Sequence, residues 1–376
     1  PAAAWFTQSN TPSNQQLISH TPGLVLPDRF FDRPILNSPY EYPSRHWDLD
    51  EHGQPTGTIV EGRRKVSFVT PIAKPKKQGK GQTALVLDEG KGLSTEAQTY
   101  DIRSLINELR TQVERWRALP DPAHWNVTPE TARLLQHWRH HKYSGIRPFF
   151  CQVEAVETVI WLTEVAPTMG KDGKRFLDHL DAVNAEANPA LLRLALKLAT
   201  GAGKTTVMAM IIAWQTVNSV RHPSSKRFIR GFLVVTPGIT IKDRLRVLQP
   251  SDPDAYYRSR ELIPSDLVGE LQHAKIVITN FHAFKHRERM ELSKGGRALL
   301  QGRGPALETL ETDGQMVQRV MPELMGLKSI LAINDEAHHC YRAKPESDTE
   351  ADLKGDDRKE AEHNREEARS WISGLE

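Results

Sequence analysis

The segment Leu198–Thr206, with the sequence LATGAGKTT, constrains the fold of this chain more than any other feature. The apolar run LLRLALKLAT leads into it and predicts a strand, and TTVMAMIIAWQTV follows it and predicts a buried helix. Gly201 and Gly203 permit positive φ values and a close approach of the backbone, so that peptide amides can point at an anion. The helix beginning near Lys204 adds the positive end of its dipole. This order of elements predicts a phosphate-binding loop.

The loop has the pattern of a Walker A motif. In such a loop Lys204 places its positive charge on the β- and γ-phosphates of a nucleotide, and Thr205 offers its hydroxyl to Mg²⁺. The first glycine of the usual pattern is Leu198 here, so only the second half of the loop is rich in glycine. A chance Gly-Lys-Thr turn is the alternative, and the strand–loop–helix order argues against it. The predicted nucleotide-binding residues of the loop are Thr200, Gly201, Ala202, Gly203, Lys204, Thr205 and Thr206.

A pair of carboxylates follows another apolar run, SILAIND, which predicts a strand that ends at Asp335 and Glu336. We expect Asp335 to hold Mg²⁺, directly or through water, and Glu336 to orient and deprotonate the attacking water. A solvated acidic turn is the alternative interpretation. His338, His339 and Cys340 also suggest a metal site, but adjacent side chains rarely converge on one ion.

The string from Asp335 to His338 resembles motif II of DEAH-type superfamily 2 helicases. Together with the upstream LATGAGKT, the string NDEAHHCYR resembles the Res subunit family of type III restriction enzymes, over residues from about 146 to 376. The resemblance implies a RecA-like α/β P-loop NTPase domain, with a parallel sheet flanked by helices and with ATP and Mg²⁺ as cofactors. The residues to which it assigns catalytic roles are Lys204, Asp335, Glu336 and His338.

The same resemblance implies a function and partners. The chain would couple ATP hydrolysis to movement on DNA, with duplex DNA as substrate and a DNA methyltransferase or other specificity subunit as partner. Two alternatives stay open: a repair or replication helicase, and a nucleotide-gated nucleic-acid-binding module without sustained hydrolysis. Strand separation at a fork would distinguish a helicase from a translocase. Mutation of Glu336 would distinguish the module from a motor, because a switch would survive the loss of hydrolysis and a motor would stall.

The segment RPFFCQVEA is similar to the glutamine motif of these motors. It makes Gln152 the candidate that reads the adenine edge, and Phe149 or Phe150 the candidate ring that stacks on the base. The alternative is the N-terminus of a helix with buried aromatic residues.

Two further loops resemble motifs Ia and Ib, which contact the nucleic-acid backbone in the family. They are Val234–Gly238 (VVTPG) and Ile278–His282 (ITNFH). The small polar groups suited to phosphate contacts lie there, and either loop could instead be a simple turn at a strand end. The candidate residues are Thr236, Pro237, Thr279 and Asn280. The basic residues between Phe281 and Arg303 either extend this surface or form a solvated face.

The rest of the chain divides by composition. Residues 1–100 predict a loop-rich region with short strands, one of them at Thr58–Thr70 after a Gly/Pro turn at 53–57. Residues 101–145 predict accessory helices, and 146–376 the RecA-like domain, with strands GFLVVTP and AKIVITN. The lysine-rich AKPKKQGKGQ is interpreted as a solvated linker, with a phosphate-contacting strand as the less favoured alternative.

Two accessory helices are predicted. Apolar residues recur at helical spacing from Ile102 to Trp116. The second helix follows in TPETARLLQHWRHH, where Thr128 suits the N-cap and Pro129 the first helical position. Its histidines are interpreted as ordinary surface or packing residues and not as metal ligands, because no carboxylate or cysteine spacing accompanies them. They are His137, His140 and His141.

Composition sets broader limits. A net charge of +3, from 50 basic and 47 acidic residues, is nearly balanced, so a nucleic-acid surface has to be a local patch. Two cysteines and no apolar stretch near the roughly 18 residues that cross a bilayer favour a cytoplasmic protein without a membrane anchor. No second RecA-like cycle of strands and no endonuclease signature follow Asp335. We therefore expect these 376 residues to be the front part of a longer protein.

Overall fold

The computed structural model describes residues 29–50, 52–66, 94–95, 98–99, 102–187, 191–237, 239–287 and 311–335. The chain divides into two compact units, which are described separately. Unit 1 takes its residues from Pro1–Thr128, Ile146–Val183 and Leu196–Val207. Unit 2 takes its residues from Pro129–Gly145, Asn184–Ala195 and Met208–Glu376. Across the described ranges, every helix is too short or too polar to span a bilayer.

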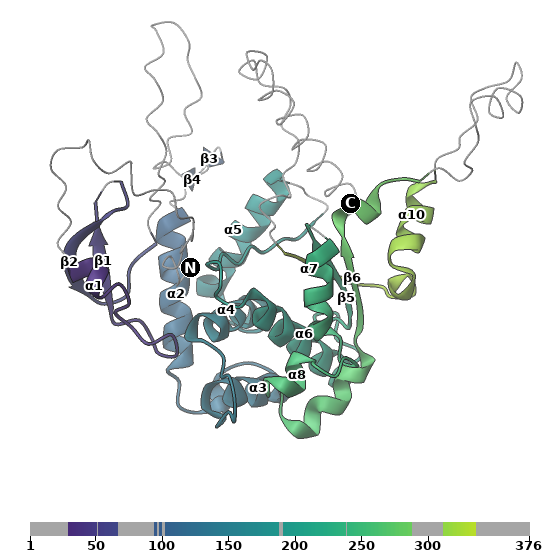
Figure 1. Ribbon diagram of the computed structural model, residues 1–376, viewed down its shortest axis with the longest axis horizontal. Helices are drawn as coiled ribbons and strands as arrows, with labels where there is room; N and C mark the ends of the chain where they lie inside the picture. Colours follow the sequence, from purple (N-terminus) through teal and green to yellow (C-terminus); the bar gives the residue numbers. More distant parts are fainter. Residues whose placement is uncertain are drawn as a thin grey trace, which may run out of the picture. The chain divides into compact units, whose positions relative to one another are not determined.

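The described part of unit 1 starts with a short helix, α1 (Arg29–Asp32), and an antiparallel hairpin of β1 (Arg45–Leu49) and β2 (Pro55–Glu61), drawn in purple in Figure 1. The strand predicted at Thr58–Thr70 is wrong in its bounds, because it starts at Pro55 and ends at Glu61. Glu61 pairs with Arg45, the first residue of β1, so the residues after it have no ladder partner on β1. Residues 67–70 of that prediction lie outside the described residues. Two short strands, β3 (Ser94–Thr95) and β4 (Gln98–Thr99), form a second antiparallel pair.

The helices of unit 1 confirm the first accessory helix, which is α2 (Ile102–Arg117). A short 3₁₀ turn, η1 (Pro122–His124), follows it. Helix α4 (Phe150–Ile160) packs against α2 and continues into a π-helical turn, η2 (Trp161–Val165). After η3 (Ala166–Thr168) comes α5 (Lys171–Ala187), whose last residues belong to unit 2. Glutamates among the buried residues of α4 indicate that this helix has polar partners inside the unit.

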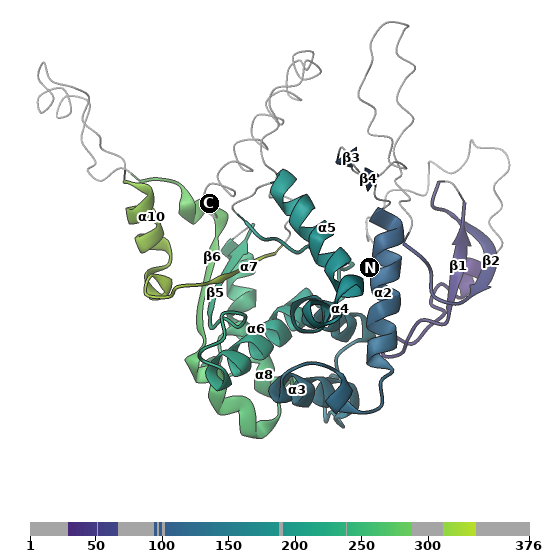
Figure 2. The ribbon, with the colours of Figure 1, turned by 180° about the vertical axis from the view of Figure 1, so that it is seen from behind.

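Unit 2 is built on a parallel sheet in the order β6-β5-β7, which confirms the three strands predicted from apolar runs. The strands are β5 (Gly231–Thr236), β6 (Lys275–Asn280) and β7 (Leu331–Asn334). Every residue of the central strand β5 is buried, as expected for a parallel strand with both faces covered. Helix α7 (Ile239–Arg244) packs against β5 and β6 (Figures 1 and 2).

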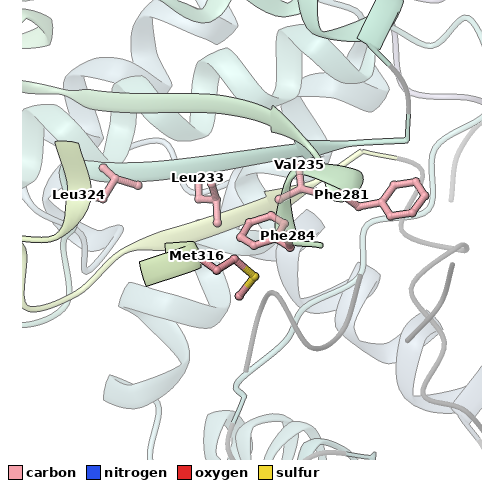
Figure 3. Close-up of a cluster of buried hydrophobic side chains, with 6 residues drawn as sticks. All are labelled: Leu233, Val235, Phe281, Phe284, Met316 and Leu324. Atoms are coloured by element: carbon pink, nitrogen blue, oxygen red, sulfur yellow. The ribbon is translucent and has the colours of Figure 1, made fainter. Parts of the chain in front are cut away.

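The hydrophobic core on one face of this sheet comes from elements far apart in the sequence. Leu233 and Val235 lie two residues apart on β5 and point to the same face, toward Phe284 and Met316 (Figure 3). Phe284 belongs to η6 (Phe281–Phe284) and Met316 to α10 (Asp313–Val320). Leu324 of η7 (Pro322–Leu324) completes the cluster together with Phe281. The core therefore fixes β5 against the segments that flank β6 and β7.

The other helices of unit 2 include both remaining predicted helices, α3 (Pro129–His140) and α6 (Lys204–Arg221), although the first turn of α6 as far as Val207 belongs to unit 1. Their contact is a buried polar one: the Thr131 hydroxyl accepts hydrogen bonds from Trp214 Nε1 at 3.1 Å and from Asn218 Nδ2 at 2.9 Å. Short helical segments complete the unit. They are η4 (Leu245–Leu248), α8 (Tyr256–Ser259) and η5 (Ser265–His273).

The strand predicted at Leu191–Thr200 is wrong, because residues 191–199 are described without a strand. Leu192 is 82% exposed, which no core strand would allow. The backbone of Arg193 forms hydrogen bonds with a side chain and not with a neighbouring strand. The Asn184 side chain accepts from the Arg193 amide at 2.8 Å and donates to the Arg193 carbonyl at 3.0 Å. An apolar run shows that a strand is possible, but a strand also needs a partner for its backbone groups.

Candidate functional site

The glycine loop leads directly into the N-terminus of α6 in unit 1. Gly201 and Gly203 have φ values of +80° and +74°, which only glycine adopts without strain. Two backbone hydrogen bonds close the loop, from Ala202 N to the Ala199 carbonyl at 3.1 Å and from Thr206 N to the Gly203 carbonyl at 2.9 Å. The helix begins at Lys204, so its first amides and the positive end of its dipole lie beside the loop.

The exposure of the loop residues varies. Thr200 and Gly201 are exposed, and Gly203, Lys204 and Thr205 are half-buried. Ala202 and Thr206 are buried, so their side chains support the loop from the inside. The exposed tip of the loop thus lies at the N-terminus of α6, and helix N-termini are the kind of site at which anions bind.

Gln152 ties α4 to this loop. Its side chain is 3% exposed, and its Nε2 donates to the Ala202 carbonyl at 2.8 Å. Its Oε1 accepts from the Phe149 amide at 2.9 Å, as in a helix N-terminal capping arrangement. The side-chain amide of glutamine has two N–H donors and an oxygen that can accept two hydrogen bonds, so these contacts do not use all of its capacity. Recognition of adenine by Gln152 therefore stays a prediction. A Cβ atom on Gly203 would overlap Gln152 Nε2, so any other residue there would displace the Gln152 side chain from its place against the loop.

The two predicted stacking rings lie against residues 39–42, which the sequence did not single out. The Phe149 ring meets the edge of Tyr40 at a centroid distance of 5.5 Å, and the Arg147 guanidinium lies 4.3 Å from the centre of the Tyr40 ring. The Phe150 amide donates to the Pro39 carbonyl at 2.9 Å. The start of α4 therefore packs against residues 39–42, a segment more than 100 residues earlier in the chain.

A buried ionic cluster lies behind that turn. Arg63, just after β2, donates both Nη groups to the two oxygens of Glu154 at 2.6 Å. Arg117, the last residue of α2, donates its Nε to Glu157 at 2.6 Å, and its Nη2 lies 3.5 Å from Glu154. Burial disfavours the charge on Glu154, but the hydrogen bonds and charge of Arg63, with Arg117, hold its pKa below the usual range. Two acidic residues three apart in a mostly apolar helix are a sequence feature from which such partners could have been predicted.

In unit 2 the parallel register places three candidate residues in one row. Thr236 pairs with Asn280 across β5 and β6, and Val235 pairs with Asn334 across β5 and β7. The Asp335 amide donates to the Val235 carbonyl at 2.9 Å, so Asp335 continues the row next to Thr236. Adjacent strands lie about 4.8 Å apart, which puts the backbones of Asn280 and Asp335 roughly 10 Å from each other.

The candidate nucleic-acid residues differ in their access to a ligand. Thr236 is fully buried and its hydroxyl donates to the Thr279 carbonyl at 3.4 Å, and Thr279 is 8% exposed. Pro237 and Asn280 are half-buried. Asn280 Oδ1 accepts from the Ala283 amide at 3.0 Å and caps η6, which leaves the amide nitrogen of its side chain at the strand end.

Several predicted residues lie outside the described residues. Glu336 and His338 are among them, with His339, Cys340, the lysine-rich segment and the part of the basic run from 288 onward. Lys285 and Arg287, the described basic residues of that run, are exposed.

His137 of α3 and His141, the residue after that helix, contact Glu261. His137 Nε2 lies 2.6 Å from the Glu261 carbonyl oxygen, and His141 Nε2 lies 2.7 Å from its carboxylate. No group of three potential metal ligands occurs in the ranges that the structure describes.

Comparison with known families gives one match. The family model described as type III restriction enzyme, res subunit, matches residues 146–358, more than half of the chain. The match includes the glutamine segment, the glycine loop, the three parallel strands and Asp335. Searches of curated proteins and of solved structures found no match.

Proposed function

Because this chain belongs to the type III restriction enzyme res subunit family, we propose that it binds ATP–Mg²⁺ through its glycine loop and couples hydrolysis to movement on DNA. Family membership supports a helicase-like ATP-binding motor domain with a RecA-like fold. The three parallel strands and their flanking helices agree with that fold.

The glycine loop is the observation that carries the proposal. Two positive-φ glycines and the start of an 18-residue helix fit a chain of phosphates. Lys204 would then neutralise charge on the β- and γ-phosphates, and the Thr205 hydroxyl would bind the metal. The bound nucleotide supplies the phosphoanhydride bond whose cleavage drives the motor.

The ends of the strands in unit 2 supply the other proposed roles. Asp335 follows β7 at its carboxyl end, where its amide bonds to Val235, and its carboxylate would bind Mg²⁺. For Glu336 and His338 the resemblance in motif II alone supports a part in activating water. We further propose that Asn280, through its side-chain amide nitrogen, and Pro237 contact the DNA backbone, since Thr236 and Thr279 are too buried to do so. A DNA methyltransferase or other specificity subunit remains the proposed partner.

The test is ATP–Mg²⁺ affinity, measured by titration calorimetry, with the thermal midpoint of each variant. Lys204→Ala should lose about 1.5–3 kcal/mol of binding free energy, the usual worth of a hydrogen bond to a charged group, which is about tenfold to hundredfold in Kd. Asp335→Asn should weaken ATP binding in Mg²⁺ more than in EDTA. Lys197→Ala is the matched control, because Lys197 is an exposed lysine seven residues before Lys204. Equal affinities for Lys204→Ala and Lys197→Ala would refute the proposed nucleotide site.

A further inference from the structure

The two sides of α4 have different partners. At 100° per residue, Glu154 and Glu157 lie 200° and 140° around the helix from Gln152, so both glutamates face away from it. Gln152 contacts the glycine loop through Ala202, whereas both glutamates contact arginines. The helix is thus held between the loop on one side and a buried ionic cluster on the other.

The arginines come from two elements that the sequence places before the family match. Arg63 follows the hairpin strand β2, and Arg117 ends α2. Their partners on α4 are almost wholly buried, with Glu154 6% and Glu157 0% exposed. The two carboxylates face these two guanidinium groups, and the charge of Arg110, also on α2, interacts with both Arg63 and Glu154.

Arg117 also contacts the first residue of α4. Its guanidinium lies 4.9 Å from the centre of the Phe150 ring, in the range of a cation–π contact. The edge of Tyr42 meets the same ring at 5.6 Å, and Arg63 lies 5.6 Å from the centre of the Tyr42 ring. The cluster therefore reaches the turn that carries Gln152.

We propose that Arg63 and Arg117 are positioning residues for the nucleotide loop: they set the place of α4, and through Gln152 they set the place of the Ala202 carbonyl. This inference rests on the proposed function of the loop. A buried carboxylate that loses its guanidinium partner moves toward water or draws water in, because an unpaired buried charge is costly. Since Glu154 and Gln152 belong to the same short helix, such a movement shifts the Gln152 amide as well. The hairpin region then contributes to ATP affinity without touching ATP.

A double-mutant cycle on the whole chain tests this. We measure ATP–Mg²⁺ affinity for the wild type, Arg63→Gln, Gln152→Ala and the double variant. Arg63→Gln should weaken ATP binding about twofold to thirtyfold, the range for substitutions that act on a site without contacting its ligand. In the Gln152→Ala background the same substitution should have almost no effect, because the link to the loop is already cut.

Controls separate positioning from loss of folding. Arg133→Gln removes an exposed ion pair with Asp266 in unit 2 and should leave ATP affinity unchanged. Arg63→Lys keeps the charge but not the two-pronged contact, so it should give a smaller loss than Arg63→Gln. If Arg63→Gln does not fold, the cycle is run with Arg63→Lys.

Additive effects of the two substitutions, or an unchanged affinity in Arg63→Gln, would overturn the inference. Lys204→Ala in the same assay keeps the two proposals apart. If Lys204→Ala weakens ATP binding as expected and the cycle is additive, the nucleotide site stands and only the positioning role is wrong. If Lys204→Ala binds ATP normally, the site itself is wrong.

Discussion

Alanine at Gly203 should destabilise the protein more than alanine at Gly201, although both glycines have positive φ. The left-handed backbone costs an alanine about 1–2 kcal/mol at either position. At Gly201 a Cβ atom would meet nothing within 4 Å, so that cost is the whole effect. At Gly203 the Cβ would overlap Gln152 Nε2, which is the end of a flexible side chain and can swing away. Swinging away breaks the bond to Ala202 and leaves a buried amide unsatisfied, at a further cost of about 1–3 kcal/mol.

The free energy of unfolding, from equilibrium denaturation, measures this difference. Gly203→Ala should lose about 2–5 kcal/mol in total, and Gly201→Ala about 1–2 kcal/mol. In a Gln152→Ala background the two substitutions should cost the same, since the group that the new methyl displaces is gone. A gap between them that persists without the glutamine side chain would refute the reasoning. So would equal costs in the wild-type background.

Two further predictions concern unit 2. Asn280→Asp keeps the oxygen that accepts from the Ala283 amide but replaces the side-chain amide nitrogen with a negatively charged oxygen. The binding free energy for DNA should therefore fall by about 1.5–3 kcal/mol, with little change in the thermal midpoint. Unchanged DNA binding in a gel-shift titration would contradict the proposed contact. Burial, with the neighbouring charge of His141, lowers the pKa of His137, so the folded protein favours the neutral ring even though the Glu261 carbonyl opposes the shift. The protein should therefore lose stability as the pH falls below about 6.5 toward the pKa of His137 in the folded state. His137→Gln keeps a hydrogen-bond donor for the Glu261 carbonyl but cannot titrate. This variant should therefore show a weaker dependence of the thermal midpoint on pH in that range.

Local patterns were sufficient where an element carries its own signal. The apolar runs of β5, β6 and β7 and the helical spacing of α2 predicted those elements, because burial requires apolar residues at a fixed period. Leu191–Thr200 shows the limit of such patterns. Its apolar residues suit a strand, but a strand forms only beside another strand that pairs with its backbone groups. Here the backbone of Arg193 forms hydrogen bonds with the Asn184 side chain instead.

The candidate site shows a similar division. The glycine loop and Gln152 are visible in short stretches of sequence, whereas the partners of α4 are not. Arg63 and Glu154 are 91 residues apart, and the sequence around either residue does not identify the other as its partner. Two glutamates within a helix of mostly apolar residues predict that basic partners exist, but only the tertiary structure identifies them. The occlusion of Thr236 was likewise invisible, because it depends on the strands beside it.

The row formed by Asn280, Thr236 and Asp335 has a consequence for how relatives of this chain can diverge. Backbone hydrogen bonds between the strands set the alignment of these three residues. Exchanging one apolar side chain for another inside β5 therefore leaves them opposite one another in the sheet. Adding or deleting one residue within β5 would instead turn Thr236 to the other face of the sheet and put the row out of step. Relatives should therefore differ by substitution within these strands and by length in the loops between them.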